Sequence, residues 1–227
     1  MDMSDGKDTQ TVEGTAVDEV FQQSLSKVTV LLFSGLLLWE FGFVDTTVAL
    51  TLLLASLAYP AYRVYKHTSF AEIGVKVHGL RTAIIQNWRP MAIYMVAMGL
   101  LVRVVEWLYP PFYQYGIETS PVDASVAPLV SFIQVVALGP PSEEILFRGI
   151  LQRYTAFFAP SKAAIVYSSV VFALTHFAAG DPLSVALDLT FHFLHGCFYG
   201  LIFSRSQNAL ISFIPHSLWN LSAFIIP

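Results

Sequence analysis

Charged residues are scarce in this chain of 227 residues. Only 12% are Asp, Glu, Lys or Arg, whereas 55% are hydrophobic, and the mean hydropathy is +0.61. Soluble globular domains carry about twice that share of charge, so an ordinary water-soluble fold is excluded. The 12 basic residues are scattered and outnumbered by 16 acidic ones. We therefore expect no nucleic-acid partner.

Cysteine is almost absent from the chain. Cys197 is the single cysteine, so no internal disulfide can form, and we interpret it as a small apolar residue.

Residues 1–25 are polar and acidic, without the basic start and early apolar core of a cleaved signal peptide. We expect this segment to be a cytoplasmic tail.

Long apolar runs fill most of the remaining sequence and predict transmembrane helices. The predicted spans are 26–43, 46–65, 90–109, one that begins near 126, 142–158, 162–179, 183–204 and 208–226. The predicted fold class is therefore all-α, a polytopic bundle of about seven or eight transmembrane helices within residues 26–227. The count depends on Gly139-Pro140-Pro141, which favours a kink or break, with Ser142 as the cap of the next helix.

Lysine and arginine are distributed unevenly between the predicted loops. Segment 63–89 holds five of them, and segment 110–125 holds none. Because cytoplasmic loops carry an excess of Lys and Arg, the first segment is placed in the cytoplasm and the second outside. We expect an integral multi-pass protein, in the plasma membrane, with a cytoplasmic N-terminus.

Three charged residues, Glu143, Glu144 and Arg148, lie inside this apolar sequence. A charge in lipid is costly, so the group indicates either a functional site or a structural ion pair. One arginine cannot neutralise two carboxylates, which favours the functional interpretation. Adjacent helix positions point about 100° apart, so we expect one glutamate to face a pocket while the other is held by Arg148 or a neighbouring helix.

Depth along the helices groups these charges with other polar residues. Glu144 lies sixteen residues before Pro160, and His176 lies sixteen after it. Antiparallel helices would bring both to one level, roughly 24 Å from the turn. His216 and Asn220 follow the next turn at comparable depth. We therefore predict that both glutamates converge with these three residues on one interior pocket.

The predicted pocket suits the activation of water. A carboxylate in a site of low dielectric can act as a general base, and a neighbouring histidine can share or shuttle the proton. A second histidine with an asparagine can donate hydrogen bonds to an oxyanion. Peptide hydrolysis needs this combination. Each histidine alone would instead be interpreted as a packing residue hydrogen-bonded between helices.

A second polar stripe lies on one face of the span 183–204. Its members are three or four residues apart: Asp188, His192, His195 and Tyr199. Gly196 and Gly200 on the same helix permit another helix to approach closely. Two interpretations are open for the stripe: a packing seam with hydrogen-bonded histidines, or additional metal ligands or substrate contacts.

Four short motifs occur in order on these predicted helices. They are EEILFR at 143–148, FALTH at 172–176, FLHGCFYG at 193–200 and HSLWN at 216–220. Together they resemble the EExxxR, FxxxH, glycine-containing and HxxxN motifs of the CAAX protease and bacteriocin-processing family, also called the CAAX amino-terminal protease or Abi family. The resemblance implies an intramembrane endopeptidase with a motif-bearing core at 142–220.

The resemblance also implies a role for each motif residue. Glu143 would activate water with His176, while His216 and Asn220 would form the oxyanion site. The supporting residues would be Glu144, Arg148, Phe172 and Gly196. No obligatory cofactor is favoured. The alternative is zinc or another divalent metal on Glu143, His176 and His216, although the HExxH helix of many zinc proteases is missing.

The resemblance implies a substrate at the lipid bilayer, namely a membrane-associated or lipidated peptide or protein. The rival interpretation is a non-catalytic membrane protein that confers immunity, binds a peptide or acts as a scaffold. A transporter would require paired broken helices in two related halves, and only one Gly-Pro interruption is present.

Overall fold

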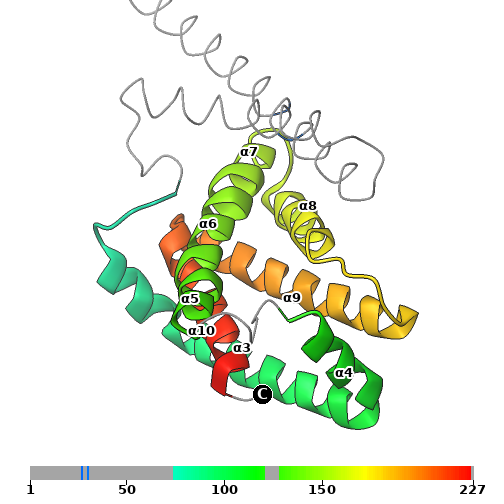
Figure 1. Cartoon of the computed structure of the whole chain (residues 1–227). Coiled ribbons are helices and arrows are strands. Elements are labelled where there is room, and N and C mark those ends of the chain that lie inside the picture. The colour runs from blue at the N-terminus through cyan, green and yellow to red at the C-terminus, as the bar shows by residue number, and fades with distance from the viewer. Residues whose placement is uncertain (1–26, 28–29, 31–73, 121–127, 226–227) are drawn as a thin grey trace, which may run out of the picture.

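The computed structural model describes residues 27, 30, 74–120 and 128–225, and all regular structure within them is helical (Figure 1). Outside the run 128–155, the helices are α3 (Leu80–Leu108), α4 (Pro110–Glu118), α8 (Ser161–Leu174), α9 (Pro182–Ser206) and α10 (Ala209–Ile225). The all-α class is confirmed. The predicted tail 1–25 and the spans 26–43 and 46–65 lie outside the described residues, apart from Lys27 and Val30. The count of seven or eight helices therefore stays a prediction.

Among the described helices, α3 and α9 are long and apolar enough to cross a membrane, judged by length and composition. α3 begins at Leu80, ten residues before the predicted span 90–109. Its 29 residues extend over roughly 43 Å, more than the hydrocarbon core requires. The basic residues Arg81 and Arg89 thus lie in the first turns of a helix and not in a loop.

Residues 128–155 form one uninterrupted helical run. Its parts are α5 (Pro128–Phe132), the π-helical stretch η2 (Ile133–Leu138), α6 (Gly139–Glu144), the π-helical stretch η3 (Ile145–Gln152) and α7 (Arg153–Thr155). No break occurs at Gly139-Pro140-Pro141. Instead the helix widens to π geometry just before the prolines, whose missing N–H groups cannot continue the regular pattern.

Ser142 does not cap a helix, contrary to the prediction. Its hydroxyl lies within α6 and donates to the carbonyl of Gly139 at 2.7 Å. Glu143 and Glu144 are the last two residues of α6, so they are not in the first turn of a new helix. Their carboxylates are positioned by tertiary contacts and not by a helix N-terminus.

α9 packs against both α8 and α10, and η3 packs against α8. The contact between α8 and α9 is close because α9 presents glycine. A Cβ atom at Gly196 would lie 2.9 Å from Ser169 Cβ and 3.0 Å from its Cα, and one at Gly200 would lie 3.1 Å from Ile165 Cγ2 on α8 and 2.7 Å from Gln152 Oε1 on η3. The predicted close approach at this glycine pair is confirmed.

Gly196→Ala should therefore destabilise the fold, by about 1–3 kcal/mol as for other overpacked sites. The obstacle is the backbone of α8, which cannot rotate away as a flexible side chain would. Gly99→Ala is the matched control, because a Cβ there meets nothing within 4 Å and alanine favours a helix. Unfolding in detergent would measure both variants. An unchanged stability of Gly196→Ala would contradict the close contact.

The segment 110–125, predicted to be an external loop, contains the short helix α4. Tyr115 on α4 donates to the carbonyl of Ala178 at 3.0 Å, and the Tyr109 hydroxyl donates to Asp181 Oδ2 at 2.6 Å. This hydrogen bond from Tyr109 lowers the pKa of Asp181. Asp181 also accepts from the backbone N–H of Ser184 and so caps α9. α4 thereby fixes the segment that follows α8.

Candidate active site

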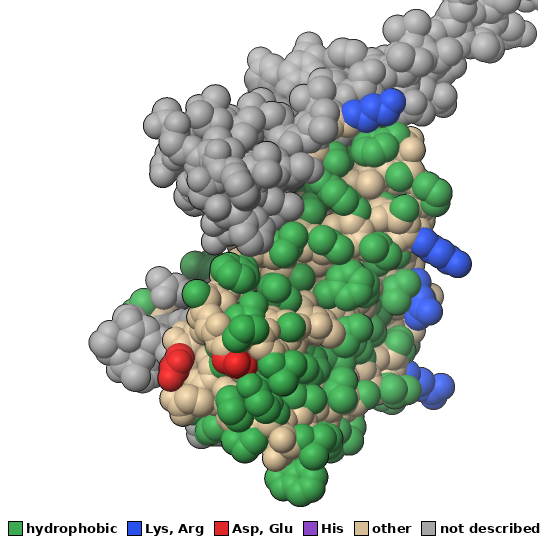
Figure 2. Space-filling model, turned by 90° about the vertical axis from the view of Figure 1, so that its right-hand side faces the viewer, with side chains coloured by type: hydrophobic (Ala, Val, Ile, Leu, Met, Phe, Trp, Pro, Cys, Tyr) green, Lys and Arg blue, Asp and Glu red, His purple; other side chains and the backbone are tan. Residues whose placement is uncertain are grey.

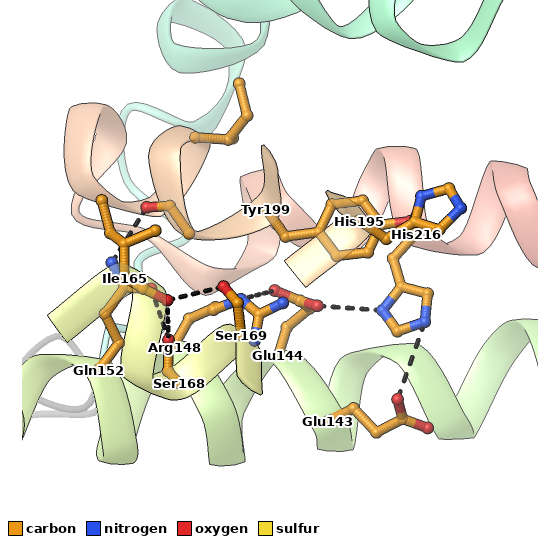
Figure 3. A network of polar contacts seen from close by, with 12 residues as sticks. Glu143, Glu144, Arg148, Gln152, Ile165, Ser168, Ser169, His195, Tyr199 and His216 are labelled. Atoms are coloured by element: carbon orange, nitrogen blue, oxygen red, sulfur yellow. Dashed lines mark hydrogen bonds and ion pairs between the residues drawn. The ribbon is translucent and has the colours of Figure 1, made fainter. Parts of the chain in front are cut away.

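Glu143 and Glu144 reach the same imidazole from adjacent positions on α6. Glu144 Oε1 lies 3.0 Å from His216 Nδ1, and Glu143 Oε2 lies 3.8 Å from His216 Nε2 (Figure 3). The two carboxylates nevertheless differ in environment, since the Glu144 side chain is 1% exposed and that of Glu143 is 32% exposed. Glu144 is the glutamate held by its neighbours, and Glu143 is the accessible one.

Arg148 holds Glu144 in the buried part of the site. Its Nε lies 3.3 Å from Glu144 Oε2, one helical turn away. The guanidinium carbon lies 4.9 Å from the ring centre of Phe172 and 5.7 Å from that of Tyr199. Aromatic faces stabilise a desolvated cation by about 2 kcal/mol. Phe172 and Tyr199 therefore complement the single carboxylate that pairs with Arg148.

His176 lies just beyond the end of α8 and faces Glu143. α8 ends at Leu174, five residues short of the predicted span, and the chain then turns. His176 Nδ1 lies 2.8 Å from the carbonyl of Phe172, and its Nε2 lies 3.9 Å from Glu143 Oε2. Because a carbonyl can only accept, Nδ1 must carry the proton. The neutral ring then presents the Nε2 lone pair to Glu143.

The same reasoning sets the tautomer of His216. An ionised Glu144 can only accept, so His216 Nδ1 carries a proton and its Nε2 faces Glu143. Glu143 Oε2 is buried and has no hydrogen-bond partner among the described residues. Three acceptor atoms thus converge on one point. A water molecule that donates to two of them would have its protons on bases and its lone pair directed outward.

The amide of Asn220 donates its hydrogen bond away from Glu143, His176 and His216. Its Nδ2 donates to the carbonyl of Val135 at 2.9 Å, and Ser217 donates to the carbonyl of Val136 at the same distance. Both acceptors belong to η2, where π geometry changes the backbone pairing. Two residues of the HSLWN motif therefore hold α10 against the π-helical stretch η2, which precedes α6.

The second polar stripe divides into two parts. His192 stacks on His176 with ring centres 4.2 Å apart, and its Nδ1 lies 3.4 Å from Asp188 Oδ1. His195 is instead buried against α3 and α10. Its Nδ1 contacts the hydroxyl of Tyr94 at 2.8 Å, and its ring centre lies 4.3 Å from that of Trp219.

The packing interpretation therefore fits His195, whereas His192 adjoins the site. Tyr94 belongs to none of the four motifs. The sequence feature that could have identified Tyr94 is its hydroxyl within an apolar span. A buried tyrosine hydroxyl needs a hydrogen-bond partner, so a polar residue on another helix is expected beside it. Gly196, from the glycine-containing motif, supports the site indirectly through the close packing of α9 on α8.

The residues present do not fit a metal ion. Glu143, His176 and His216 are those that zinc would use here. Over residues 74–120 and 128–225, however, no three His, Cys, Asp or Glu side chains form a group able to hold a metal ion. That the reaction needs no metal stays a prediction, which treatment with a chelator tests.

Comparison with known proteins identifies the same region of the chain. Residues 125–222 match the family described as Type II CAAX prenyl endopeptidase Rce1-like. No curated protein and no solved structure matches the chain. The matched segment contains all four motifs and both glutamates with their histidine partners. The resemblance inferred from the motifs is confirmed for residues 125–222, which are similar to the CAAX prenyl endopeptidase family and make up 98 of the 227 residues.

Proposed function

We propose that this protein is an intramembrane endopeptidase in which Glu143 and His176 activate water to hydrolyse a peptide bond. The observation that carries the proposal is the unpartnered Oε2 atom of Glu143, which faces the Nε2 atoms of His176 and His216 at 3.9 and 3.8 Å. These separations exceed a direct hydrogen bond and suit one that passes through water. The family match supports a peptidase.

In the proposed reaction, Glu143 takes a proton from water as the oxygen attacks the carbonyl carbon of the substrate. His176, held by the carbonyl of Phe172, shares the same water. His216 donates from Nε2 to the oxyanion in the form that has taken a second proton from solvent, and it keeps that proton through the cycle. The buried carboxylate of Glu144, 3.0 Å from Nδ1, stabilises that imidazolium, as an aspartate does in a serine protease triad.

Asn220 is proposed as the second oxyanion donor. Its amide has two N–H groups, and the carbonyl of Val135 accepts only one of them. The hydrogen bond to Val135 would orient the amide, and the other N–H is then available to the substrate. This role is the one that the motif implies for Asn220. In it, η2 supplies the carbonyl that orients the amide.

The proposed substrate is a membrane-associated or lipidated peptide or protein, cleaved at the bilayer. The apolar helices α3 and α9 support this setting. Apolar side chains also cover much of the face shown in Figure 2, whereas Lys and Arg gather along one margin. Lipid would cover such a face without penalty. A multi-pass plasma-membrane protein with a cytoplasmic N-terminus is proposed.

Cleavage by the purified protein in lipid vesicles tests the function. Lipidated and unlipidated versions of one peptide would be added, and the products identified by mass spectrometry. We expect cleavage at one bond, faster for the lipidated peptide, and unchanged after treatment with a chelator. Activity that a chelator abolishes and only zinc restores would overturn the metal-free mechanism. Binding without cleavage would favour the rival, a non-catalytic immunity or scaffold protein.

A further inference from the structure

His192 and Asp188 form a dyad one helical turn apart on α9, beside the proposed water site. His192 Nδ1 lies 3.0 Å from the backbone carbonyl of Asp188 and 3.4 Å from its carboxylate Oδ1. Both neighbours accept hydrogen bonds, so Nδ1 carries a proton and Nε2 is the atom that can gain or lose one. A carboxylate behind an imidazole stabilises its protonated form and orients the ring.

The dyad lies where a substrate would reach the site. The side chains of Glu143, His176 and His192 are 32%, 29% and 29% exposed, whereas those of Glu144 and His216 are 1% and 5% exposed. The accessible edge of the site therefore consists of one carboxylate and two stacked imidazoles. A peptide bond placed against Glu143 and His176 would lie beside His192, because the two rings are 4.2 Å apart.

The proposed chemistry leaves one task unassigned. Peptide hydrolysis expels an amine, which must gain a proton as the C–N bond breaks. Glu143 holds the proton taken from water, and His216 faces the oxyanion in the proposed function. Those steps do not assign the residue that delivers a proton to the leaving nitrogen, and the candidates at the exposed edge are Glu143, which holds the proton from water, and His192.

We propose that His192, held by Asp188, is the general acid that protonates the leaving amine. The inference rests on the proposed function. The C–N electron pair moves to nitrogen, which takes the proton from His192 Nε2. Glu143 then gives up the proton it took from water, and His192 regains one, through solvent at the exposed edge. The sum is addition of water across the peptide bond, with both residues restored.

The charged and titratable groups around His192 come from several elements. Asp188 lies on the same helix, His176 follows α8, and Glu143 on α6 lies beyond His176. Two stacked imidazoles cannot both be protonated without repulsion. Asp188 is placed to favour the proton on His192, while His176 stays neutral for its role beside water. His192, paired with Asp188, is thus placed to act as the acid, and the neutral His176 stacked on it is placed to act beside the base Glu143.

The test compares a peptide with a second substrate in which a thioester replaces the scissile amide. A thiolate leaves without a proton because a thiol is far more acidic than an amine. His192→Phe keeps an aromatic ring against His176 but cannot donate. We expect this variant to cleave the amide about 10²–10⁴-fold more slowly and the thioester within about tenfold of the wild-type rate. Asp188→Asn should show a smaller loss with the same preference.

Two results would overturn the inference: wild-type cleavage of the amide by His192→Phe, or equal loss on both substrates. If His192→Phe does not fold, the ratio of amide to thioester cleavage in Asp188→Asn decides in the same way. Glu143→Gln reports on the proposed function separately, since a lost base should slow both substrates. Full activity of that variant would overturn the assignment of the base, whatever His192→Phe does.

Discussion

Glu143→Gln should lower the turnover of the cleaved peptide by about 10²–10⁴-fold, the range for loss of a general base. Glutamine has the same size and keeps an acceptor at the position of Oε1, but it has no basicity. The side chain is partly exposed and has no ion-pair partner closer than 3.8 Å, so its charge contributes little to the fold. Substrate binding and unfolding should therefore stay close to wild type.

The matched control is Glu118→Gln, which removes an exposed carboxylate from α4. Glu118 is exposed, accepts a hydrogen bond from Gln114 on the same helix and belongs to none of the four motifs. It should cleave at the wild-type rate. Turnover measured at saturating peptide separates chemistry from binding. A Glu143→Gln protein that binds and cleaves normally would exclude this residue as the base and favour the non-catalytic alternative.

The sequence could predict which residues meet, because few polar residues lie in apolar helices. Counting from the turns placed Glu144 and His176 at one depth, and the structure has His176 facing the adjacent Glu143. Helical spacing of four likewise anticipated the pair of Glu144 with Arg148. These inferences need only the rise per residue and the antiparallel packing of consecutive helices.

The details depend on contacts that no local pattern encodes. Both glutamates reach His216 because one imidazole has nitrogens on two edges, which the 100° separation of adjacent positions does not reveal. α8 ends at Leu174, and His176 in the turn that follows faces Glu143. Tyr115 anchors the segment after His176 from a region predicted to be a loop. The partners in these contacts are more than thirty residues apart, so the contacts follow only from tertiary structure.

The π-helical stretches η2 and η3 within residues 128–155 could not be predicted from the sequence either. Sequence rules place a break or kink at consecutive prolines, but they do not foresee that π-helical stretches on both sides of α6 keep the run continuous. The carbonyls of Val135 and Val136 then accept side-chain donors from α10. The motif residues Ser217 and Asn220 thus depend on a local geometry set more than eighty residues away.

Glu144 has a different task from its neighbour, because its charge is enclosed with that of Arg148. Both side chains are at most 1% exposed, and Nε of Arg148 lies 3.3 Å from Glu144 Oε2. The other guanidinium nitrogens have no hydrogen-bond partner among the described residues, and the ring of Phe172 lies 4.9 Å away. Glu144 is therefore the carboxylate on which the burial of this cation depends.

Glu144→Gln should lower the free energy of unfolding in detergent micelles by about 3–5 kcal/mol, as when one partner of a buried ion pair is removed. The glutamine oxygen can still accept from His216 Nδ1, so the change isolates the charge. Adding Arg148→Met should recover most of the loss, because no uncompensated buried charge is then left. Glu118→Gln should leave stability unchanged. If the single variant were as stable as wild type, or the double variant no better than the single, Glu144 would not be the counter-ion that holds Arg148 in the core.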